Sequence, residues 1–356
     1  MDTIKKKLAL VIPSLKVGGM ERVMIELSHY LSLKPNLEVF LILLGENHKF
    51  FNLPINITVI EPKFNLNNKF YYTIQIFLYL RRTIKNVQPD ALLSFGEMYN
   101  SFVLLSTLFL STKIYVSDRS KPDKDWGVLH NLLRRIIYRR ANGIISQTSY
   151  SKTFLKKEVG HSNIVTIPNP IRQTIHVNHL FKRKKVILTV GRLIKSKRID
   201  ILLDIFERSY INGWELWIVG DGPEMDNLKK IVSDKGLDSV VVFFGSQSNV
   251  YTFYNQASIF AFCSESEGFP NALLEAISFQ LPCISFDCVA GPNDIIDHGD
   301  NGFLVKMYDL NQYGIYLNML MHDENLRWAF GQKSLKKSKL FDISIVGEIY
   351  YKTLIQ

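Results

Sequence analysis

The sequence predicts an α/β protein built from two doubly wound parallel-sheet domains. Short apolar segments alternate with longer amphipathic segments along most of the 356 residues, and this alternation is typical of a parallel sheet covered by helices. The alternation stops at Pro168 and Pro170 and restarts after a polar, basic stretch. Because proline is excluded from helix interiors and interior strands, we place a domain boundary there. The predicted domains are residues 1–172 and 173–335, with a helical segment at 336–356 that packs back towards the first domain.

The first domain is expected to begin with a strand, a loop and a helix. Residues 8–12 are uniformly apolar, and the helix after the loop carries apolar side chains at helical spacing. The same pattern continues through the domain, with strands predicted at 39–44, 91–94, 113–117 and 143–146, and helices at 71–87 and 129–140.

The second domain repeats this architecture without repeating the sequence. Strands are predicted at 186–190, 215–219, 240–244, 259–263 and 283–286, and helices at 199–209, 224–234, 250–256 and 271–279, followed by a mostly helical tail from 309. Ligands of such sheets bind at the carboxyl ends of the strands. We therefore expect the two domains to leave a cleft between these ends, and the functional residues to lie in the strand-to-helix loops.

Composition narrows the class of protein. Charged residues make up 21% and hydrophobic residues 47% of the chain, which favours a folded globular protein. The three cysteines have no metal-binding spacing, so we expect free thiols in a reducing compartment. We predict neither a secretion signal nor a membrane span. Residues 1–175 contain 24 Lys and Arg against 12 Asp and Glu, so the first domain should attract an anionic partner.

The first loop of interest contains Gly18 and Gly19, with Arg22 in the helix that follows. Glycines allow a close backbone approach, and the free N–H groups of a helix N-terminus bind phosphate or hydroxyl groups. A tight turn followed by an ordinary N-terminal acid, Glu21, explains the same residues equally well. The loop matches neither the dinucleotide fingerprint nor a Walker loop.

Cations follow the first strand of the second domain. Gly191 and Arg192 end the strand, and Lys195 and Lys197 come next. A guanidinium and an ammonium group here would neutralise a diphosphate as it leaves. Solvated surface cations are the other interpretation, which we favour for Lys195 and Arg198 but not for Arg192. In the next loop, Asp221 either stabilises the turn or lines a nucleotide pocket.

The strongest pattern joins two glutamates, Glu267 and Glu275, with seven residues between them. The first lies in a loop after a strand, and the second lies in the second turn of a helix that starts near Asn271. Carboxylates accept hydrogen bonds from the paired hydroxyls of a ribose or a hexose, and Gly268 lets backbone amides approach a ligand. Two ordinary acids at a helix start are the weaker interpretation.

In this order, the loops resemble those of the retaining nucleotide-sugar glycosyltransferases of family 4, which have the GT-B fold of two Rossmann-like domains facing across a cleft. The resemblance spans residues 8–305 and depends on five segments at strand ends, which begin at Gly18, Gly191, Gly220, Glu267 and Gly291. It implies a nucleotide-sugar site in the second domain and an acceptor site in the first.

The resemblance also implies roles for individual residues. Arg192 and Lys197 would hold the diphosphate, Glu267 the donor hexose and Glu275 the ribose. The other donor-binding residues that it implies are Gly191, Asp221, Gly268, Phe269, Pro270, Asn271, Ala272 and Leu273. On the acceptor or diphosphate side it implies Gly18, Gly19, Arg22, Glu97, Asn100, Asp118 and Arg119.

The implied reaction moves a hexose or N-acetylhexosamine from a nucleotide sugar to a membrane-associated, lipid-diphosphate-linked glycan. We expect the donor to be a UDP-sugar and the product to be a surface polysaccharide such as lipopolysaccharide or capsule. The resemblance implies retention of anomeric configuration, no cofactor and no metal ion. A GT-B sugar-nucleotide epimerase or phosphorylase, and a non-enzymatic nucleic-acid-binding protein on the same scaffold, are the alternatives. The basic clusters lack the interleaved aromatic residues of a base-stacking platform, so we expect no nucleic-acid partner.

The chain departs from the family pattern in two places. Many members have a histidine in a first-domain loop where this chain has Asp118, and the glycine that usually follows the phosphate-binding lysine is replaced by Arg198. Lys195 therefore stays an alternative phosphate partner to Lys197. Asp123 and Asp125 imitate an Asp-x-Asp metal site, but they lie outside the nucleotide-binding domain, and we expect no metal there.

Residues 129–140 combine leucine and isoleucine with four arginines, Arg134, Arg135, Arg139 and Arg140. A helix of this kind binds an anionic membrane surface. A helix packed by its apolar face, with its cations in solvent, is the other interpretation. With the family resemblance, the first predicts a cytoplasmic protein attached peripherally to the inner face of the cytoplasmic membrane.

Overall fold

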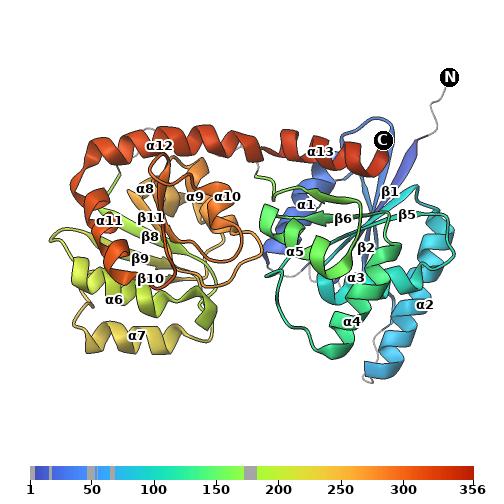
Figure 1. Cartoon of the computed structure of the whole chain (residues 1–356), viewed down its shortest axis with the longest axis horizontal. Coiled ribbons are helices and arrows are strands. Elements are labelled where there is room, and N and C mark those ends of the chain that lie inside the picture. The colour runs from blue at the N-terminus through green and yellow to red at the C-terminus, as the bar shows by residue number, and fades with distance from the viewer. Residues whose placement is uncertain (1–4, 16–17, 46–52, 54, 65–68, 172–182) are drawn as a thin grey trace. The chain divides into compact units, whose positions relative to one another are not determined.

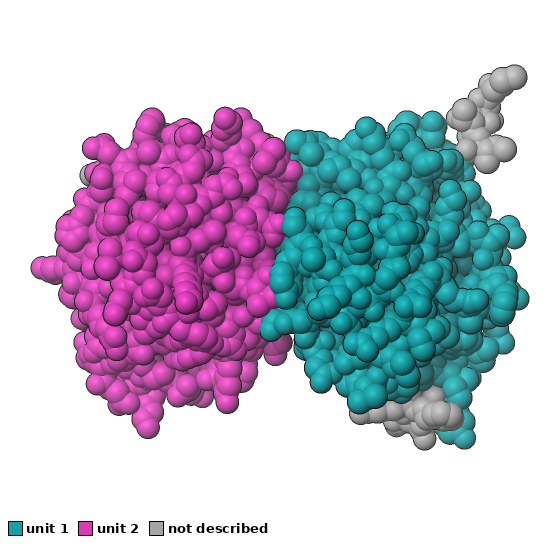
Figure 2. Space-filling view, in the orientation of Figure 1, with its two compact units in different colours: residues 1–170, 342–356 teal, residues 171–341 magenta. Residues whose placement is uncertain are grey.

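The computed structural model describes residues 5–15, 18–45, 53, 55–64, 69–171 and 183–356. The chain divides into two compact units (Figure 2), unit 1 from residues 1–170 and 342–356 and unit 2 from residues 171–341. The chain returns to unit 1 at residue 342, later than the 336 that we predicted. Residues 172–182 of the predicted linker lie outside the described residues.

Unit 1 contains a seven-stranded parallel sheet in the order β3-β2-β1-β4-β5-β6-β7 (Figure 1). Its strands are β1 (Lys6–Ile12), β2 (Leu37–Leu43), β3 (Ile57–Ile60), β4 (Ala91–Phe95), β5 (Lys113–Ser117), β6 (Gly143–Ser146) and β7 (Ile164–Thr166). Its helices are α1 (Gly19–Ser32), α2 (Lys69–Val87), α3 (Glu97–Ser106), α4 (Val128–Ile137), α5 (Ser149–Val159) and α13 (Ile343–Ile355), with a 3-10 turn at Tyr138–Arg140.

Side-chain alternation along the strands sends apolar residues to both faces of this sheet. Leu8 and Leu10 of β1 pack into one cluster with residues of α1 and α13. Ala9 and Val11 pack into the other cluster, on the side of α2, α3 and α5. Because both faces are covered, the strands are apolar throughout, as parallel strands usually are.

Unit 2 contains a six-stranded parallel sheet in the order β10-β9-β8-β11-β12-β13. Its strands are β8 (Val186–Val190), β9 (Glu215–Val219), β10 (Val241–Gly245), β11 (Ile259–Phe262), β12 (Cys283–Phe286) and β13 (Gly302–Val305). Its helices are α6 (Ile199–Ser209), α7 (Met225–Asp234), α8 (Tyr251–Gln256), α9 (Asn271–Ser278), α10 (Pro292–Ile295), α11 (Leu310–His322) and α12 (Glu324–Ser338), with 3-10 turns at Lys195–Lys197 and Lys339–Phe341.

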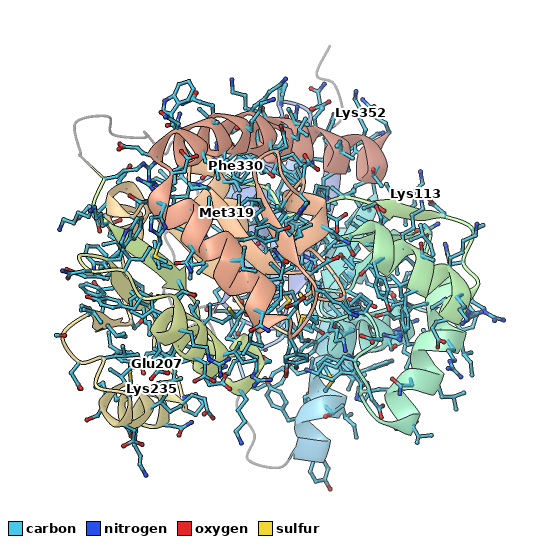
Figure 3. The ribbon with its side chains drawn as sticks, turned by 60° about the vertical axis from the view of Figure 1, so that its left-hand side comes forward. Lys113, Glu207, Lys235, Met319, Phe330 and Lys352 are labelled. Carbon is cyan, nitrogen blue, oxygen red and sulfur yellow. The ribbon has the colours of Figure 1, made fainter. Side chains whose placement is uncertain are left out.

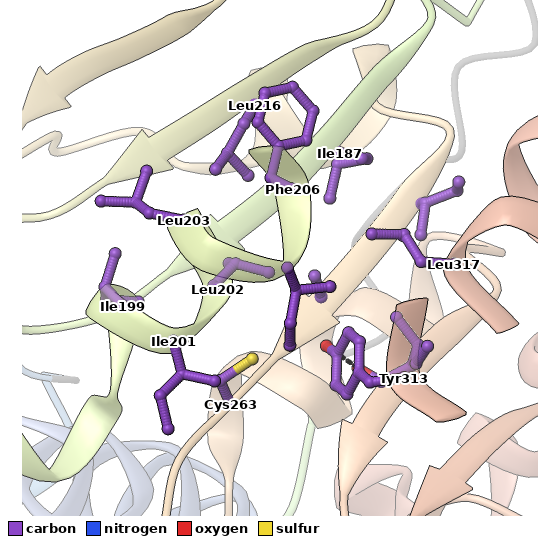
Figure 4. Packing of buried hydrophobic residues seen from close by; sticks show 14 of the residues in the cluster. Ile187, Ile199, Ile201, Leu202, Leu203, Phe206, Leu216, Cys263, Tyr313 and Leu317 are labelled. Carbon is purple, nitrogen blue, oxygen red and sulfur yellow. Dashed lines mark hydrogen bonds between the residues drawn. The ribbon is translucent and has the colours of Figure 1, made fainter. Parts of the chain in front are cut away.

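The core of unit 2 is tied to the sheet by a buried tyrosine of α11 (Figure 4). The Tyr313 hydroxyl donates to the Ile284 carbonyl at 3.1 Å and accepts from the Phe262 N–H at 3.1 Å. Around it, α6 and α11 bury leucine and isoleucine side chains against the sheet. On the surface, Lys235, the C-cap residue of α7, forms an ion pair with Glu207 of α6 at 2.6 Å (Figure 3). The three cysteines are buried and unpaired.

The last helix, α13, packs on α1 within unit 1. Gly347 lies against the ring of Tyr30 so closely that a Cβ atom would collide with it. Lys34, two residues after the end of α1, forms an ion pair with Glu348 at 2.5 Å. The C-terminal segment is therefore part of unit 1, and α12 stays in unit 2, where it contacts α9.

Both units have the doubly wound parallel sheets that the sequence predicts. The strands β5, β6, β8, β9 and β12 have the predicted bounds. The short edge strands β3 and β7, the edge strand β13 and the helices α3 and α5 were not among the predicted elements. These elements are short or have polar faces, so their periodicity is weak.

Candidate functional site

Four strands of unit 2 end in loops that meet at one edge of the sheet. These are the β8 loop (residues 191–198), the β9 loop (220–224), the β11 loop (263–270) and the β12 loop (287–291). The strand order reverses between β8 and β11. Such a reversal opens a crevice at the carboxyl ends of the strands, where ligands of doubly wound sheets bind.

An ion pair joins the β8 loop to the β11 loop. Lys197 Nζ lies 2.5 Å from Glu267 Oε1, and the two side chains are only 22% and 12% exposed. The ammonium group also lies 5.3 Å from the centre of the Phe262 ring. Partial exclusion of water strengthens such a pair relative to one on the open surface. The structure thus brings together the lysine and the glutamate that we predicted as catalytic.

The β8 and β9 loops are held together by backbone contacts that require glycine. The Leu193 N–H donates to the Asp221 carbonyl at 2.9 Å, and the Glu224 N–H donates to the Leu193 carbonyl at 3.1 Å. A Cβ atom on Gly220, whose φ is +139°, would collide with the Gly191 carbonyl. Gly220 is therefore explained by close approach of two loops.

Other predicted residues of these loops differ in their surroundings. Arg192 is exposed, and within the described part of the chain its guanidinium group makes no hydrogen bond or ion pair. Lys195 is also exposed and lines a hollow of about 430 Å³ beside α7, with Glu224 and Asn227. The Asp221 carboxylate accepts from the Gly222 N–H at 2.7 Å, as a turn-stabilising residue does. Of the two lysines, Lys197 is the one paired with Glu267.

Helix α9 places the second glutamate. Glu275 is buried in the second turn, and Asn271 begins the helix after Pro270. Gly268 is buried between Glu267 and Phe269. Ala272 lies partly buried and Leu273 fully buried against the sheet.

The ring of Phe269 does not face a ligand space. It packs in the core of unit 2, with its centre 5.9 Å from that of Phe341. Phe269 can therefore offer a ligand only its backbone. Gly291 of the β12 loop lies against Pro270, where a Cβ atom would collide with the proline ring, so the β12 loop supports the start of α9.

Two residues of the β11 loop were missed by sequence reasoning. The Ser264 hydroxyl is buried without a hydrogen-bond partner among the described residues. It lines a gap of about 10 Å³ with Arg192 and Lys197, enough for a single water-sized group. Glu265 accepts from the Tyr308 hydroxyl at 2.8 Å. Neither residue type is distinctive in a sequence, so only the fold reveals their position.

In unit 1, Gly18 precedes helix α1 in extended conformation, with φ −176°. A Cβ atom there would collide with the Glu21 carboxylate. Burial raises the pKa of Glu21, an effect partly offset by a backbone hydrogen bond. Gly19 and Arg22 lie in the first turns of α1, and the Arg22 N–H donates to the Gly18 carbonyl at 3.2 Å.

Glu97 holds the loop that follows β5. Its carboxylate accepts from the backbone N–H groups of Arg119 at 3.1 Å and Ser120 at 2.9 Å, and from the Ser120 hydroxyl. The Arg119 guanidinium lies 3.4 Å from the centre of the Phe95 ring. It donates to the Tyr350 hydroxyl of α13 at 2.8 Å. The C-terminal helix therefore contributes a partner to this loop, which the sequence did not indicate.

Asp118 and Asn100 lie in a buried polar cluster. The Asp118 carboxylate accepts from Asn100 Nδ2 at 3.1 Å and from the Tyr138 hydroxyl at 2.7 Å. Its second oxygen lies 3.8 Å from Arg134 Nη1. Burial, and then the charge of Glu97, raise the pKa of Asp118 to about 6, against the opposing effects of Arg134 and the two hydrogen bonds. Asp118 and Asn100 thus have protein partners inside unit 1.

The arginines of α4 do not share one environment. Arg134 is buried beside Asp118, whereas Arg135, Arg139 and Arg140 are exposed. The apolar residues Val128, Leu129, Leu132 and Ile136, called here the α4 face, are 51% to 87% exposed. Ile137 packs against the core of unit 1 and Arg135 is exposed, as the interpretation of a packed helix with solvated arginines expects, but the α4 face does not form the buried side. Arg134 and Tyr138, four residues apart, form the buried side instead.

The Asp123 and Asp125 carboxylates have local structural partners. Asp123 pairs with Lys121 at 3.3 Å. Asp125 accepts from the Gly127 N–H at 2.8 Å and from Asn131 Nδ2 at 2.7 Å, contacts that order the start of α4. Within the described ranges, no group of three or more His, Cys, Asp or Glu side chains is arranged to hold a metal ion.

Both halves of the chain match models of glycosyltransferase families. Residues 17–174 match the model described as "Glycosyltransferase Family 4", and residues 171–337 match "Glycosyl transferases group 1". Together with the two doubly wound sheets, these matches decide the family. The chain belongs to the GT-B glycosyltransferases. The predicted family resemblance and fold class are thereby confirmed.

Individual relatives agree with this assignment. The chain is 29% identical to the amylovoran biosynthesis glycosyltransferase AmsD of Erwinia amylovora, with 90% of this chain and 91% of AmsD covered. It is 24% identical to the GalNAc-alpha-(1->4)-GalNAc-alpha-(1->3)-diNAcBac-PP-undecaprenol alpha-1,4-N-acetyl-D-galactosaminyltransferase of Campylobacter jejuni, over 98% of both chains.

A solved GT-B structure shows the same fold. The crystal structure of an S. aureus TarM mutant in complex with fondaparinux, alpha-GlcNAc-glycerol and UDP has a TM-score of 0.83 with this chain, at 14% identity, and covers 99% of this chain and 100% of TarM.

The buried Asp118 predicts a pH-dependent stability. The folded protein keeps this proton up to about pH 6, whereas an unfolded aspartate releases it near pH 4. Between these values the folded state binds more protons, so ionisation of Asp118 lowers stability as pH rises. We expect the stability of the wild type relative to Asp118→Asn to fall between pH 4.5 and pH 7, measured by urea unfolding. A difference that is flat or rises with pH would contradict the buried, proton-binding position of Asp118.

Proposed function

We propose that this glycosyltransferase moves a hexose or N-acetylhexosamine from a UDP-sugar to a lipid-diphosphate-linked glycan, with retention of configuration, in the synthesis of a cell-surface polysaccharide. The observation that carries the proposal is the ion pair between Lys197 and Glu267, at the strand reversal of the unit that matches the group 1 model. Such a site presents a cation and a sugar-binding carboxylate to the same ligand.

The relatives support this choice of substrates. The C. jejuni relative is named for an acceptor linked to undecaprenol through a diphosphate, and AmsD is named for amylovoran biosynthesis. The TarM structure contains UDP. These properties belong to those proteins. They make a UDP-sugar and a lipid-linked glycan the first substrates to test with this chain.

In the proposed reaction, the bond between the anomeric carbon and the β-phosphate oxygen breaks, and its electron pair stays on that oxygen. The ammonium of Lys197 and the guanidinium of Arg192 stabilise the negative charge that gathers there, and this stabilisation is larger in the transition state than in the bound donor. The acceptor hydroxyl attacks the same face of the sugar, and its proton passes to the departing phosphate oxygen. No metal ion or cofactor is assigned to these steps.

The two glutamates have separate roles in the proposal. Glu267 accepts hydrogen bonds from hydroxyl groups of the donor hexose, and Glu275 accepts from the ribose hydroxyls. Backbone groups from Gly268 to Leu273, at the start of α9, contact the sugar and phosphates. Glu267 lies next to Lys197, so both groups can contact one bound donor.

The proposal also includes attachment to an anionic membrane. No helix among the described residues is long and apolar enough to cross a bilayer. The α4 face is exposed, and Arg139 and Arg140, also exposed, lie in the 3-10 turn that follows the helix. Apolar side chains beside cations are the features that place a helix in the interface of an anionic bilayer. We propose that the α4 face binds the inner surface of the cytoplasmic membrane, where a lipid-linked acceptor is found.

Replacing Glu267 by glutamine tests the transfer site. We expect the rate of sugar transfer to fall by about 100-fold or more, because the neutral amide neither holds Lys197 nor matches the carboxylate in binding sugar hydroxyls. The measurement is UDP release from a panel of UDP-glucose, UDP-galactose, UDP-GlcNAc and UDP-GalNAc, with circular dichroism to check folding. Asp123→Ala, the matched control outside the site, should keep the wild-type rate. Loss of activity in the control with retention in Glu267→Gln would overturn the site assignment.

The membrane proposal is tested with Leu132→Ser combined with Ile136→Ser. These side chains are 51% and 55% exposed, and their loss should weaken binding to phosphatidylglycerol-containing vesicles by about tenfold or more. Sedimentation with the vesicles, at low and high salt, measures binding.

The control for this experiment is a second exposed apolar pair with the same spacing, Ile315 and Met319 of α11, which are 54% and 45% exposed. Met319 is labelled in Figure 3. Serine at both of these positions should leave vesicle binding unchanged, because α11 itself contains no lysine or arginine. Equal binding by wild type and the α4 variant would exclude the α4 face as the membrane contact.

A further inference from the structure

We propose that Arg198 is a positioning residue, which keeps the β8 and β11 loops in register when a bound donor separates Lys197 from Glu267. The inference deepens the proposed function and rests on it. This chain has arginine at position 198, where the family pattern usually has glycine after the phosphate-binding lysine.

The backbone of Arg198 explains why glycine would suit the position. Its φ and ψ angles are 49° and 43°, the left-handed conformation. Glycine adopts this conformation freely, whereas a side chain with a Cβ atom makes it unfavourable. An arginine therefore persists here against a backbone preference, and its side chain must supply interactions that glycine would lack.

The Arg198 guanidinium contacts Asp200 on one side and Glu265 and Tyr308 on the other. Arg198 Nη2 lies 2.9 Å from Asp200 Oδ2, and Arg198 Nε lies 3.1 Å from Asp200 Oδ1, so the aspartate fixes the guanidinium plane. The remaining nitrogen, Nη1, lies 3.4 Å from Glu265 Oε2 and 3.3 Å from the Tyr308 hydroxyl. Tyr308 in turn donates to the same oxygen of Glu265 at 2.8 Å.

These contacts lie beside the ion pair of the proposed donor site. Arg198 follows Lys197 directly, and Glu265 lies two residues before Glu267. Next to the two ion pairs, the Glu265 N–H donates to the Ser196 carbonyl at 2.9 Å. The β8 and β11 loops are thus joined by three contacts, made by Ser196, Lys197 and Arg198. A bound donor would interact with Lys197 and Glu267 but not with the groups of the other two contacts.

The Glu265–Ser196 hydrogen bond and the link from Arg198 to Glu265 become important when a donor binds. A diphosphate draws Lys197 towards itself, and a hexose takes hydrogen bonds from Glu267, so their mutual ion pair weakens at the moment when both must be correctly placed. The backbone hydrogen bond and the link from Arg198 to Glu265 remain. The three charged side chains of this link are 27% to 42% exposed, so each pair adds little stability. Their effect is on geometry, to which transfer rates are sensitive.

The test compares Arg198→Gly with wild type and with Arg198→Lys. Glycine relieves the backbone while removing the link, so the melting temperature should stay close to that of the wild type. Transfer from the UDP-sugar that the wild type uses best should nevertheless lose about 10- to 100-fold in kcat/KM, because Glu267 is less well placed. The affinity for UDP alone should change by no more than about twofold, since UDP lacks the sugar that Glu267 binds. Arg198→Lys should recover part of the loss.

A second variant and a second measurement separate the possible failures. Combining Arg198→Gly with Glu265→Gln should be no worse than Arg198→Gly alone, because both changes remove the same link. Hydrogen exchange of residues 264–268 should be faster in Arg198→Gly than in wild type, whether or not a substrate is known. Wild-type exchange and wild-type kcat/KM in Arg198→Gly would overturn the positioning role. A wild type that turns over no UDP-sugar would instead overturn the proposed function, and the exchange measurement would still decide the role of Arg198.

Discussion

The ion pair between Lys197 and Glu267 is the constraint on which the candidate donor site depends. It joins the loops that follow β8 and β11, the two strands at which the order of the unit 2 sheet reverses. Both groups are largely shielded from water, so the pair is less screened than one on the surface. The ion pair therefore holds the cation and the carboxylate close together at the strand reversal.

The rest of unit 2 supports this pair. Glycines at 220 and 291 allow neighbouring loops to touch without side chains between them, and the buried helix α9 carries Glu275. In unit 1, the predicted site residues are instead bonded to other residues of the same unit. Its loop after β5 is fixed from within by Glu97, and Asp118 is satisfied by Asn100, Tyr138 and Arg134. In this chain, the position where many family members have a histidine is thus occupied by a carboxylate directed into the protein.

The repeating apolar strands and the glycine-rich loops were sufficient to predict the parallel sheets and the residues at their ends. The pairing of Lys197, rather than Lys195, with Glu267 was not predictable, because both lysines lie in a short 3-10 turn whose orientation depends on contacts with the β11 loop. The burial of Phe269 and Arg134 was equally hidden. Each is decided by a partner distant in sequence, Phe341 and Asp118 respectively, and a local pattern carries no information about such partners.

The most direct measurement of the central claim is the rate of UDP release by the variant in which Arg192 and Lys197 are both replaced by methionine. The wild-type rate is measured beside it, with and without EDTA. If fixed cations of unit 2 stabilise the departing diphosphate, the double variant loses about 100-fold or more in kcat, and EDTA leaves the wild-type rate unchanged. A double variant that retains the wild-type rate, or a wild type that EDTA inactivates, would contradict the account.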